Sequence, residues 1–228
     1  MKLYRIEKPA TWLVFNMDPI FTCPHILRVS GHGDGPKYVS DPYRLAKQSS
    51  CLIYSVGSNG NYKFEDGLYE VLKNDSNQNP CEIHVFDPNP SYSREGDPVT
   101  KNIHYHSWGL KSSYTESREF GGFQFHSIQD TMEKLGHQGR RLDLFKIDCE
   151  GCEMTSYEDW MDLDIRFILI ETHMNRDNLA KQGQQMFDKF AQRGFVPYSK
   201  EANTMPSNAT PGTLFEFSFI RLHTDSFV

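Results

Sequence analysis

Four side chains capable of acid–base chemistry follow two apolar segments in the second half of the chain. Asp148 and Glu150 come just after the segment Leu142–Ile147, and Glu171 and His173 stand at the end of the next one. Carboxylates this close together repel each other and need a cation, a donor or water beside them, so such clusters are candidate functional sites. Histidine, with a reference pKa of about 6.5, suits proton transfer near neutral pH. The four residues are therefore candidate catalytic groups.

The same cluster would also suit a divalent cation. Asp148, Glu171 and His173 offer the oxygen and imidazole ligands that bind magnesium, manganese or zinc, and a cation there would lower the pKa of a bound hydroxyl group. Structural roles are the simpler alternative, because a strand-end acid often caps the next helix and a histidine can hydrogen-bond at a helix start. The residue types leave catalysis, metal binding and a structural role open.

A glycine-containing turn forms a second candidate site. The apolar segment Cys51–Val56 leads into a turn whose glycines let the backbone approach a ligand, and the following helix would direct free N–H groups toward it. The candidate binding residues are Ser55, Gly57, Ser58, Asn59, Gly60 and Asn61. So short a motif also occurs in ordinary strand-to-helix turns.

Further candidates follow the next two strand-like segments. Asp87 ends the segment EIHVF, where a carboxylate can accept both hydroxyl hydrogens of a ribose. Ser107 and Trp108 follow the segment Ile103–His106, and the indole would either stack on an adenine ring or belong to the core. An aspartate before a proline is by itself an ordinary turn residue. Its place at the same sheet edge as the glycine turn favours ligand binding.

From residue 51 onward, short apolar segments alternate with amphipathic segments of helix length. Apolar stretches such as LDLFKI and RFILIE are typical of strands covered on both faces, and the alternation predicts right-handed crossovers and a mostly parallel sheet. The expected strands are Cys51–Val56, Glu82–Phe86, Ile103–His106, Leu142–Ile147, Arg166–Glu171, Phe195–Ser199 and Leu214–Leu222. The expected helices are Lys63–Lys73, Ser127–Leu135, Met154–Met161 and Asp177–Arg193. The last two strands have no helix between them, which indicates a terminal hairpin.

The length of 228 residues suits one α/β domain. Residues 1–50, with the glycine-rich loop at 31–37, are expected to form a cap or lid segment on a catalytic unit of residues 51–228. The net charge of −6 offers no general cationic surface for phosphates, so no nucleic-acid partner is expected. The run Phe120–Phe125 is expected to form a strand rather than a substrate platform.

Localisation follows from apolar runs and cysteines. No apolar run approaches the length of a membrane span, and the first residues lack the apolar core of a signal peptide. The five cysteines are irregularly spaced, which favours reduced thiols. Cys149 and Cys152 form a C-x-x-C with no second pair to complete a zinc site, so we interpret them as packing residues. We expect a soluble, cytoplasmic protein unless an N-terminal anchor or signal has been removed.

Together the motifs resemble the FkbM-type S-adenosylmethionine-dependent methyltransferases, especially their eukaryotic methyltransferase-like branch. The resemblance rests on CLIYSVGSNGNYKFED, EIHVFDPN, HSWGL, LFKIDCEGCE, ILIETH and FEFSFI, and extends from the Gly-Asp-Gly-Pro-Lys loop nearly to the end. It implies a Rossmann-like seven-stranded methyltransferase sheet, mostly parallel with an antiparallel last strand and with helices on both faces. It also implies S-adenosylmethionine as the cofactor, held by the glycine turn, Asp87, Ser107, Trp108 and Asp148.

The resemblance implies methyl transfer to an oxygen, or a nitrogen, of a small molecule, sugar or peptide side chain. Ser55 departs from the pattern, because many methyltransferases carry an acid there for the cofactor's amino group. Asp34, Gly35 and Lys37 look like a feature of this branch, and the sequence assigns them no role. Two alternatives stay open: an NAD(P)-dependent oxidoreductase, which would lack the terminal hairpin and the acidic cluster, and a catalytically inactive module that keeps the fold.

Overall fold

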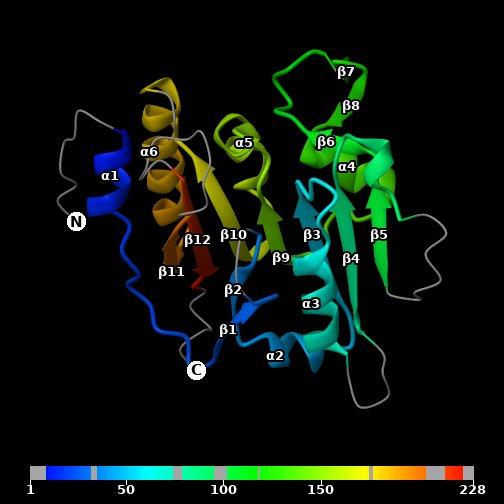
Figure 1. Ribbon diagram of the computed structural model, residues 1–228, viewed down its shortest axis with the longest axis horizontal. Coiled ribbons are helices and arrows are strands. Elements are labelled where there is room, and N and C mark those ends of the chain that lie inside the picture. Colours follow the sequence, from blue (N-terminus) through cyan, green and yellow to red (C-terminus); the bar gives the residue numbers. More distant parts are fainter. Residues whose placement is uncertain are drawn as a thin grey trace.

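A seven-stranded sheet runs through the middle of the molecule (Figure 1). The computed structural model describes residues 9–31, 35–73, 79–94, 102–117, 119–174, 177–203 and 214–222, so Asp34 lies outside the described residues. In spatial order the strands are β11 (Phe195–Ala202), β12 (Leu214–Arg221), β10 (Ile165–His173), β9 (Leu142–Ile147), β3 (Cys51–Val56), β4 (Cys81–Phe86) and β5 (Ile103–His106). Strand β12 is antiparallel to both neighbours, whereas the strands from β10 to β5 are parallel. The predicted fold class is confirmed.

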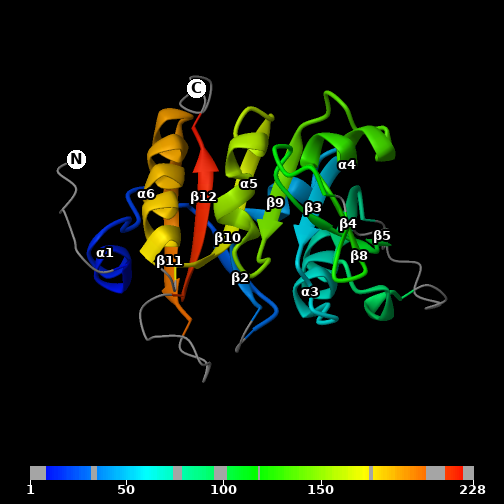
Figure 2. The ribbon, with the colours of Figure 1, turned by 90° about the horizontal axis from the view of Figure 1, so that it is seen from above.

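Helices cover both faces of this sheet (Figure 2). One face carries α4 (Ile128–Leu135), α5 (Cys152–Trp160) and α6 (Asp177–Gln192). The other carries α3 (Lys63–Leu72), α2 (Pro42–Ala46) and the hairpin of β1 (Ile26–Val29) and β2 (Lys37–Ser40). Each face buries its own apolar cluster, as expected of strands that are apolar throughout. Within the described residues, no helix is long and apolar enough to span a membrane.

The ends of α4 show why its sequence forms a helix there. Ser127 caps the start, where its Oγ accepts the backbone N–H of Asp130 at 3.1 Å. Gly136 ends the helix with a φ of 71°, a conformation that glycine adopts without strain. The four predicted helices all exist, with boundaries shifted by no more than two residues.

A small three-stranded sheet lies beside the carboxyl end of β5, and sequence reasoning found it only in part. It consists of β6 (Trp108–Leu110), β8 (Phe123–His126) and β7 (Glu119–Phe120). The predicted strand Phe120–Phe125 is wrong as one piece, because Gly121 and Gly122 both take positive φ and turn it back on itself.

The described part of residues 1–50 packs against the main domain. Helix α1 (Pro9–Phe15) stacks Trp12 on Phe187 of α6, with ring centroids 5.7 Å apart. The carbonyl oxygen of Tyr38 on β2 accepts hydrogen bonds from Tyr198 at 2.9 Å and from Ser218 at 2.8 Å. These contacts make β2 an inner layer beneath β11 and β12, and the role of the segment as a lid stays a prediction.

Two disulfides correct the expectation of reduced cysteines. Cys51 and Cys81 open the neighbouring strands β3 and β4 as register partners, with Cα atoms 4.4 Å apart. Cys149 and Cys152 are joined across the turn between β9 and α5, with Cα atoms 5.4 Å apart. The prediction of reduced thiols is wrong for these four cysteines, because strand register and a turn pair cysteines whose sequence spacing gave no such sign. Cys149 and Cys152 do pack against the core, as expected, but as a disulfide, and Cys23 keeps a free thiol. The cysteines therefore no longer support a cytoplasmic location, because disulfides persist mainly in oxidising compartments.

Candidate functional site

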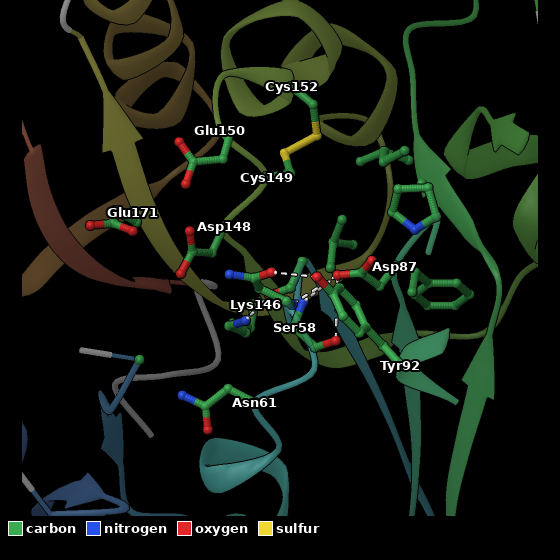
Figure 3. A pocket seen from close by; sticks show the side chains of 18 of the residues that line it. Ser58, Asn61, Asp87, Tyr92, Lys146, Asp148, Cys149, Glu150, Cys152 and Glu171 are labelled. Atoms are coloured by element: carbon green, nitrogen blue, oxygen red, sulfur yellow. Dashed lines mark hydrogen bonds between the residues drawn. A yellow bond between two sulfur atoms is a disulfide. The ribbon is translucent and has the colours of Figure 1, made fainter. Parts of the chain in front are cut away.

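A pocket of about 460 Å³ opens at the carboxyl ends of the central strands (Figure 3). It lies where the strand order changes direction, because β4 lies on one side of β3 and β9 on the other. Open α/β sheets bind ligands at such a point, and the volume suits a cofactor. The lining residues are Gly35, Val56, Gly57, Ser58, Asn59, Asn61, Phe64, Phe86, Asp87, Pro88, Tyr92, Gly109, Leu110, Phe125, Lys146, Asp148, Cys149, Glu150, Cys152 and Glu171.

The glycine turn after β3 lies directly against the end of β9. Gly57 has a φ of 78°, and a Cβ at this position would collide with the carbonyl oxygen of Asp148. The Nζ of Lys146 on β9 donates a hydrogen bond to the Gly57 carbonyl oxygen at 2.5 Å. Glycine is therefore required here by the contact between two strand ends, whereas the sequence had suggested only room for a ligand.

Asp87 holds the glycine turn from the end of β4. Its Oδ2 accepts the backbone N–H groups of Ser58 at 3.1 Å and Asn59 at 2.8 Å, and its Oδ1 accepts that of Asn89 at 3.1 Å. The hydroxyl of Tyr92 donates to the Oδ1 of Asn59 at 3.0 Å. Hydrogen bonds to a carboxylate are strong, so this side of the pocket is fixed by its own backbone.

The opposite side of the pocket carries buried charges from several strands. Asp148 follows β9, and Glu171 on β10 is the register partner of Glu216 on β12. Lys37 on β2 is 1% exposed, and its Nζ donates to Asp148 at 3.2 Å and to Glu216 at 2.5 Å. A buried ammonium between carboxylates offsets their mutual repulsion. We call Lys37, Asp148, Glu171 and Glu216 the charged cluster.

The charged cluster pushes the pKa values of its two pocket acids apart. Burial opposes ionisation of Asp148, but Lys37 and Lys146 outweigh it and hold the Asp148 pKa well below its usual range. Burial and the neighbouring Asp148 charge raise the pKa of Glu171 to about 8. Burial alone would lower the pKa of Lys37, but Asp148 and Glu216 hold it above its usual range. At neutral pH an ionised Asp148 thus stands beside a largely protonated Glu171, the kind of divergence that separates acid and base roles.

His173 lies behind the pocket wall and is held by a buried glutamate. The Oε1 of Glu153 accepts the backbone N–H of His173 at 3.1 Å and lies 2.8 Å from its Nδ1. The Nε2 lies 3.3 Å from Glu150 and 3.7 Å from Glu171. Burial alone would lower the His173 pKa, but Glu153 and Glu171 raise it to about 9. The ring is therefore charged at neutral pH and carries no free lone pair there.

The structure gathers most, but not all, of the predicted site residues around the pocket. Those in the lining are Gly57, Ser58, Asn59, Asn61, Asp87, Asp148, Glu150 and Glu171. Those outside the lining are Ser55, Gly60, Ser107, Trp108 and His173. Ser55 is fully buried and donates from Oγ to Glu65 of α3 at 2.5 Å. Trp108 packs on the ring of His106, with centroids 4.6 Å apart.

Sequence reasoning missed the partners of the acids. Lys37 was noticed but given no role, and Glu153 and Glu216 were not singled out. The one available signal was a charged residue inside an otherwise strand-like segment, as Glu216 is in FEFSFI. Lys37 stands 111 residues from Asp148, so no local pattern pairs them. The apolar lining residues Leu110 and Phe125 come from the small sheet, which the sequence showed only in part.

The chain is similar to solved structures of other proteins at low sequence identity. The chain is similar to a structure named as an rRNA methylase from Clostridium thermocellum, with 8% identity, a TM-score of 0.47 and coverage of 80% of this chain and 94% of that one. A structure named as an RNA methyltransferase from Pyrococcus horikoshii gives 9% identity, a TM-score of 0.44 and coverage of 79% of each chain. A structure named as a Streptococcus mutans methyltransferase in complex with SAH gives 14% identity, a TM-score of 0.45 and coverage of 80% and 96%.

The curated proteins compared with the chain contain no match. A family model described as a methyltransferase domain, however, matches residues 3–221. That match covers nearly the whole chain, including the pocket and the charged cluster. The chain therefore belongs to the methyltransferase-domain family.

Proposed function

We propose that the chain transfers a methyl group from S-adenosylmethionine to an oxygen, or alternatively a nitrogen, of a small molecule, sugar or peptide side chain. The observation that carries the proposal is the pair Asp148 and Glu171, two adjacent pocket acids with opposite pKa shifts. The family match supports the reaction class. Strand β12 is antiparallel and lies between β10 and β11, which gives the terminal hairpin. A nicotinamide-dependent oxidoreductase would lack this hairpin, so the topology weighs against that alternative.

The pocket fits this cofactor on its chemistry. Asp87 supplies a carboxylate for the ribose hydroxyl groups, Leu110 and Phe125 supply apolar surface for adenine, and Asp148 supplies a negative charge for the amino group. Bound S-adenosylmethionine would contribute an activated methyl sulfonium. The chain then needs mainly to orient the acceptor and to receive its proton.

Glu171 is the residue that we assign to receive the proton. It lines the pocket, and its pKa of about 8 lies near the operating range of a general base. Asn203 donates from Nδ2 to the Glu171 Oε1 at 2.7 Å, which orients the carboxyl group. His173 is charged at neutral pH, so we assign it the positioning of Glu150 and Glu171.

A divalent cation is the alternative partner of the same residues. Asp148, Glu171 and His173 each offer one ligand atom within 4.8 Å of the others. Lys37, however, already supplies a positive charge to Asp148, and His173 would have to lose its proton first. These two facts favour proton transfer without a metal.

Within this proposal we assign the chain to the FkbM-type group, and the motifs quoted from the sequence support that assignment. The net charge of −6 favours an acceptor other than nucleic acid, because phosphate binding depends on cationic surface. A sugar, a phenol or a peptide hydroxyl is an acceptor from which Glu171 could take a proton.

Cofactor binding and turnover test the proposal separately. Calorimetry should show binding of S-adenosylhomocysteine and none of NAD. A panel of sugars, phenols and hydroxyl-bearing peptides should then yield an acceptor of labelled methyl groups. Glu171→Gln should lower kcat by about 10²–10⁴-fold, the usual contribution of a general base, with cofactor affinity nearly unchanged.

The outcomes separate the alternatives. Failure to bind S-adenosylhomocysteine at millimolar concentration would favour a module that keeps the fold without activity. An active Glu171→Gln variant would remove Glu171 from the mechanism. Loss of activity in EDTA that is restored by Mg²⁺ or Mn²⁺, with Glu171→Gln and His173→Asn equally inactive, would replace proton transfer by a metal mechanism.

A further inference from the structure

A second cluster of polar side chains lies away from the pocket, toward the opposite end of β4. Glu82 and His84 on β4 and His137 after α4 each offer one ligand atom, and these atoms all lie within 4.8 Å of one another. The Oε2 of Glu82 is 3.6 Å from the His84 Nε2 and 3.7 Å from the His137 Nε2. These separations are too long for good hydrogen bonds. Two ligands about 2.1 Å from a tetrahedral zinc lie about 3.4 Å apart, close to what is found here.

One member of this cluster has a buried atom in need of a partner. The Nε2 of His84 is buried without a hydrogen-bond partner among the described residues, and the residue is 6% exposed. Its other ring nitrogen, Nδ1, lies 2.9 Å from the Nε2 of His106. When the Nδ1 proton is donated to His106, the Nε2 lone pair faces Glu82 and His137. An unsatisfied buried nitrogen in a native fold is unusual, and an ion is one of its few explanations.

The remaining two ligands are oriented by outer hydrogen bonds. The Nδ1 of His137 lies 2.7 Å from the Tyr54 hydroxyl oxygen, which leaves its Nε2 directed at Glu82. Arg140 donates to both carboxylate oxygens of Glu82, at 3.0 and 3.2 Å. Metal-binding imidazoles and carboxylates are held by outer contacts of this kind, which fix the tautomer and the ring orientation.

We propose that Glu82, His84 and His137 bind one zinc ion that ties the start of β4 to the turn between α4 and β9. Two imidazoles and one carboxylate form a known ligand set for zinc, whereas magnesium and calcium prefer oxygen ligands. The Glu82 side chain is 35% exposed, so water can complete the coordination. None of the three residues lines the large pocket, which separates this site from methyl transfer. The ion would stabilise the fold without taking part in the reaction.

Zinc binding to the full chain tests the proposal. The protein is freed of metal with a chelator under non-reducing conditions, which keep Cys149 and Cys152 paired, and is titrated with zinc chloride by calorimetry. We expect one zinc per chain and a higher melting temperature with zinc. Glu82→Gln and His137→Asn, shown to be folded by circular dichroism, should weaken zinc binding by more than the roughly 10–100-fold that loss of an outer partner causes.

Two histidine variants serve as matched controls. His25→Asn changes an exposed histidine far from the cluster in sequence, and His173→Asn changes the histidine behind the pocket. Both should keep the wild-type affinity for zinc. The zinc X-ray absorption spectrum should show nitrogen and oxygen at about 2.0–2.1 Å and no sulfur at about 2.3 Å.

Several results would overturn the zinc site. A wild-type chain that binds no zinc would leave the cluster as polar side chains bridged by water. Unchanged affinity in both Glu82→Gln and His137→Asn, or loss of binding in His173→Asn alone, would place the ion elsewhere. Sulfur in the absorption spectrum would assign the ion to the cysteines beside the pocket.

Discussion

The two sides of the pocket are stabilised in different ways. On the β3–β4 side, Asp87 after β4 accepts the backbone N–H groups of Ser58 and Asn59 in the turn after the neighbouring strand β3. On the β9–β10 side, Asp148 and its neighbours depend on Lys37, an ammonium brought from β2. The first side is held in place by hydrogen bonds from its own backbone, which suits binding. The second holds charges in a balance that one proton can shift, which suits acid–base chemistry.

Removing the Lys37 charge should have the largest effect, a loss of folding stability on the β9–β10 side. Lys37→Met leaves the buried Glu216 and the half-buried Asp148 without the Lys37 charge, which should lower the free energy of unfolding by about 3–5 kcal/mol. Urea denaturation measures the loss. Lys73→Met is the matched control, because the Lys73–Glu70 pair is exposed and such pairs contribute about 0–1 kcal/mol. Equal losses in the two variants would contradict the dependence of this side on Lys37.

Gly57→Ala should act on the contact between the two sides. A Cβ there collides with the Asp148 carbonyl oxygen and the residue keeps a φ of 78°, so overpacking and backbone strain should together destabilise the fold by about 2–4 kcal/mol. Binding of S-adenosylhomocysteine should fall as well. Gly139→Ala isolates the strain, because Gly139 has a φ of 74° with open space around its Cβ position. If both variants lose the same stability, the strand contact is unimportant.

Asp87→Asn should affect binding more than folding. Asparagine keeps the shape, and its amide oxygen can still accept from Ser58 and Asn59, but its NH2 group cannot accept the Asn89 N–H, and the charge offered to ribose hydroxyl groups is lost. The loss should be about 1.5–3 kcal/mol, a roughly 10–150-fold rise in Kd for S-adenosylhomocysteine by calorimetry. Asp66→Asn on α3, outside the pocket lining, is the control and should bind normally. Normal affinity in Asp87→Asn would show that the carboxylate serves the turn alone.

The same contrast explains what the sequence could predict. The hydrogen bonds of the β3–β4 side join residues 28 and 29 positions apart, within one strand–helix–strand unit, so the strand, the glycine turn and Asp87 all followed from successive local patterns. The acids after β9 and on β10 were found for the same reason, since strand ends in a parallel sheet meet at one edge. The role of Lys37 could not be predicted from the sequence, because its partners depend on how β2 packs against the finished sheet. Its lysine side chain in a short strand carries no sign of burial.

The disulfides and the small sheet show the other limit of sequence reasoning. Cys51 and Cys81 are paired by strand register, which spacing along the chain does not determine. Trp108 was a candidate either for stacking on adenine or for the core, and it packs against the core, with its ring between His106 and His126. Phe125 of the small sheet lines the pocket instead. Strands of two to four residues contain too few positions for a periodic pattern to appear.

The pH dependence of turnover should also distinguish the two sides of the pocket, and this is the smallest of the expected effects. If Glu171 must be ionised to accept a proton, its pKa of about 8 means that the competent fraction rises with pH. That fraction grows from about one tenth at pH 7 to about three quarters at pH 8.5, so kcat should rise roughly eightfold. Affinity for S-adenosylhomocysteine, assigned mainly to the Asp87 side, should change little over this range. Glu171→Gln should give a low and flat profile, which separates this titration from that of the acceptor. A wild-type rate that stays constant or falls between these pH values would show that Glu171 is not the base.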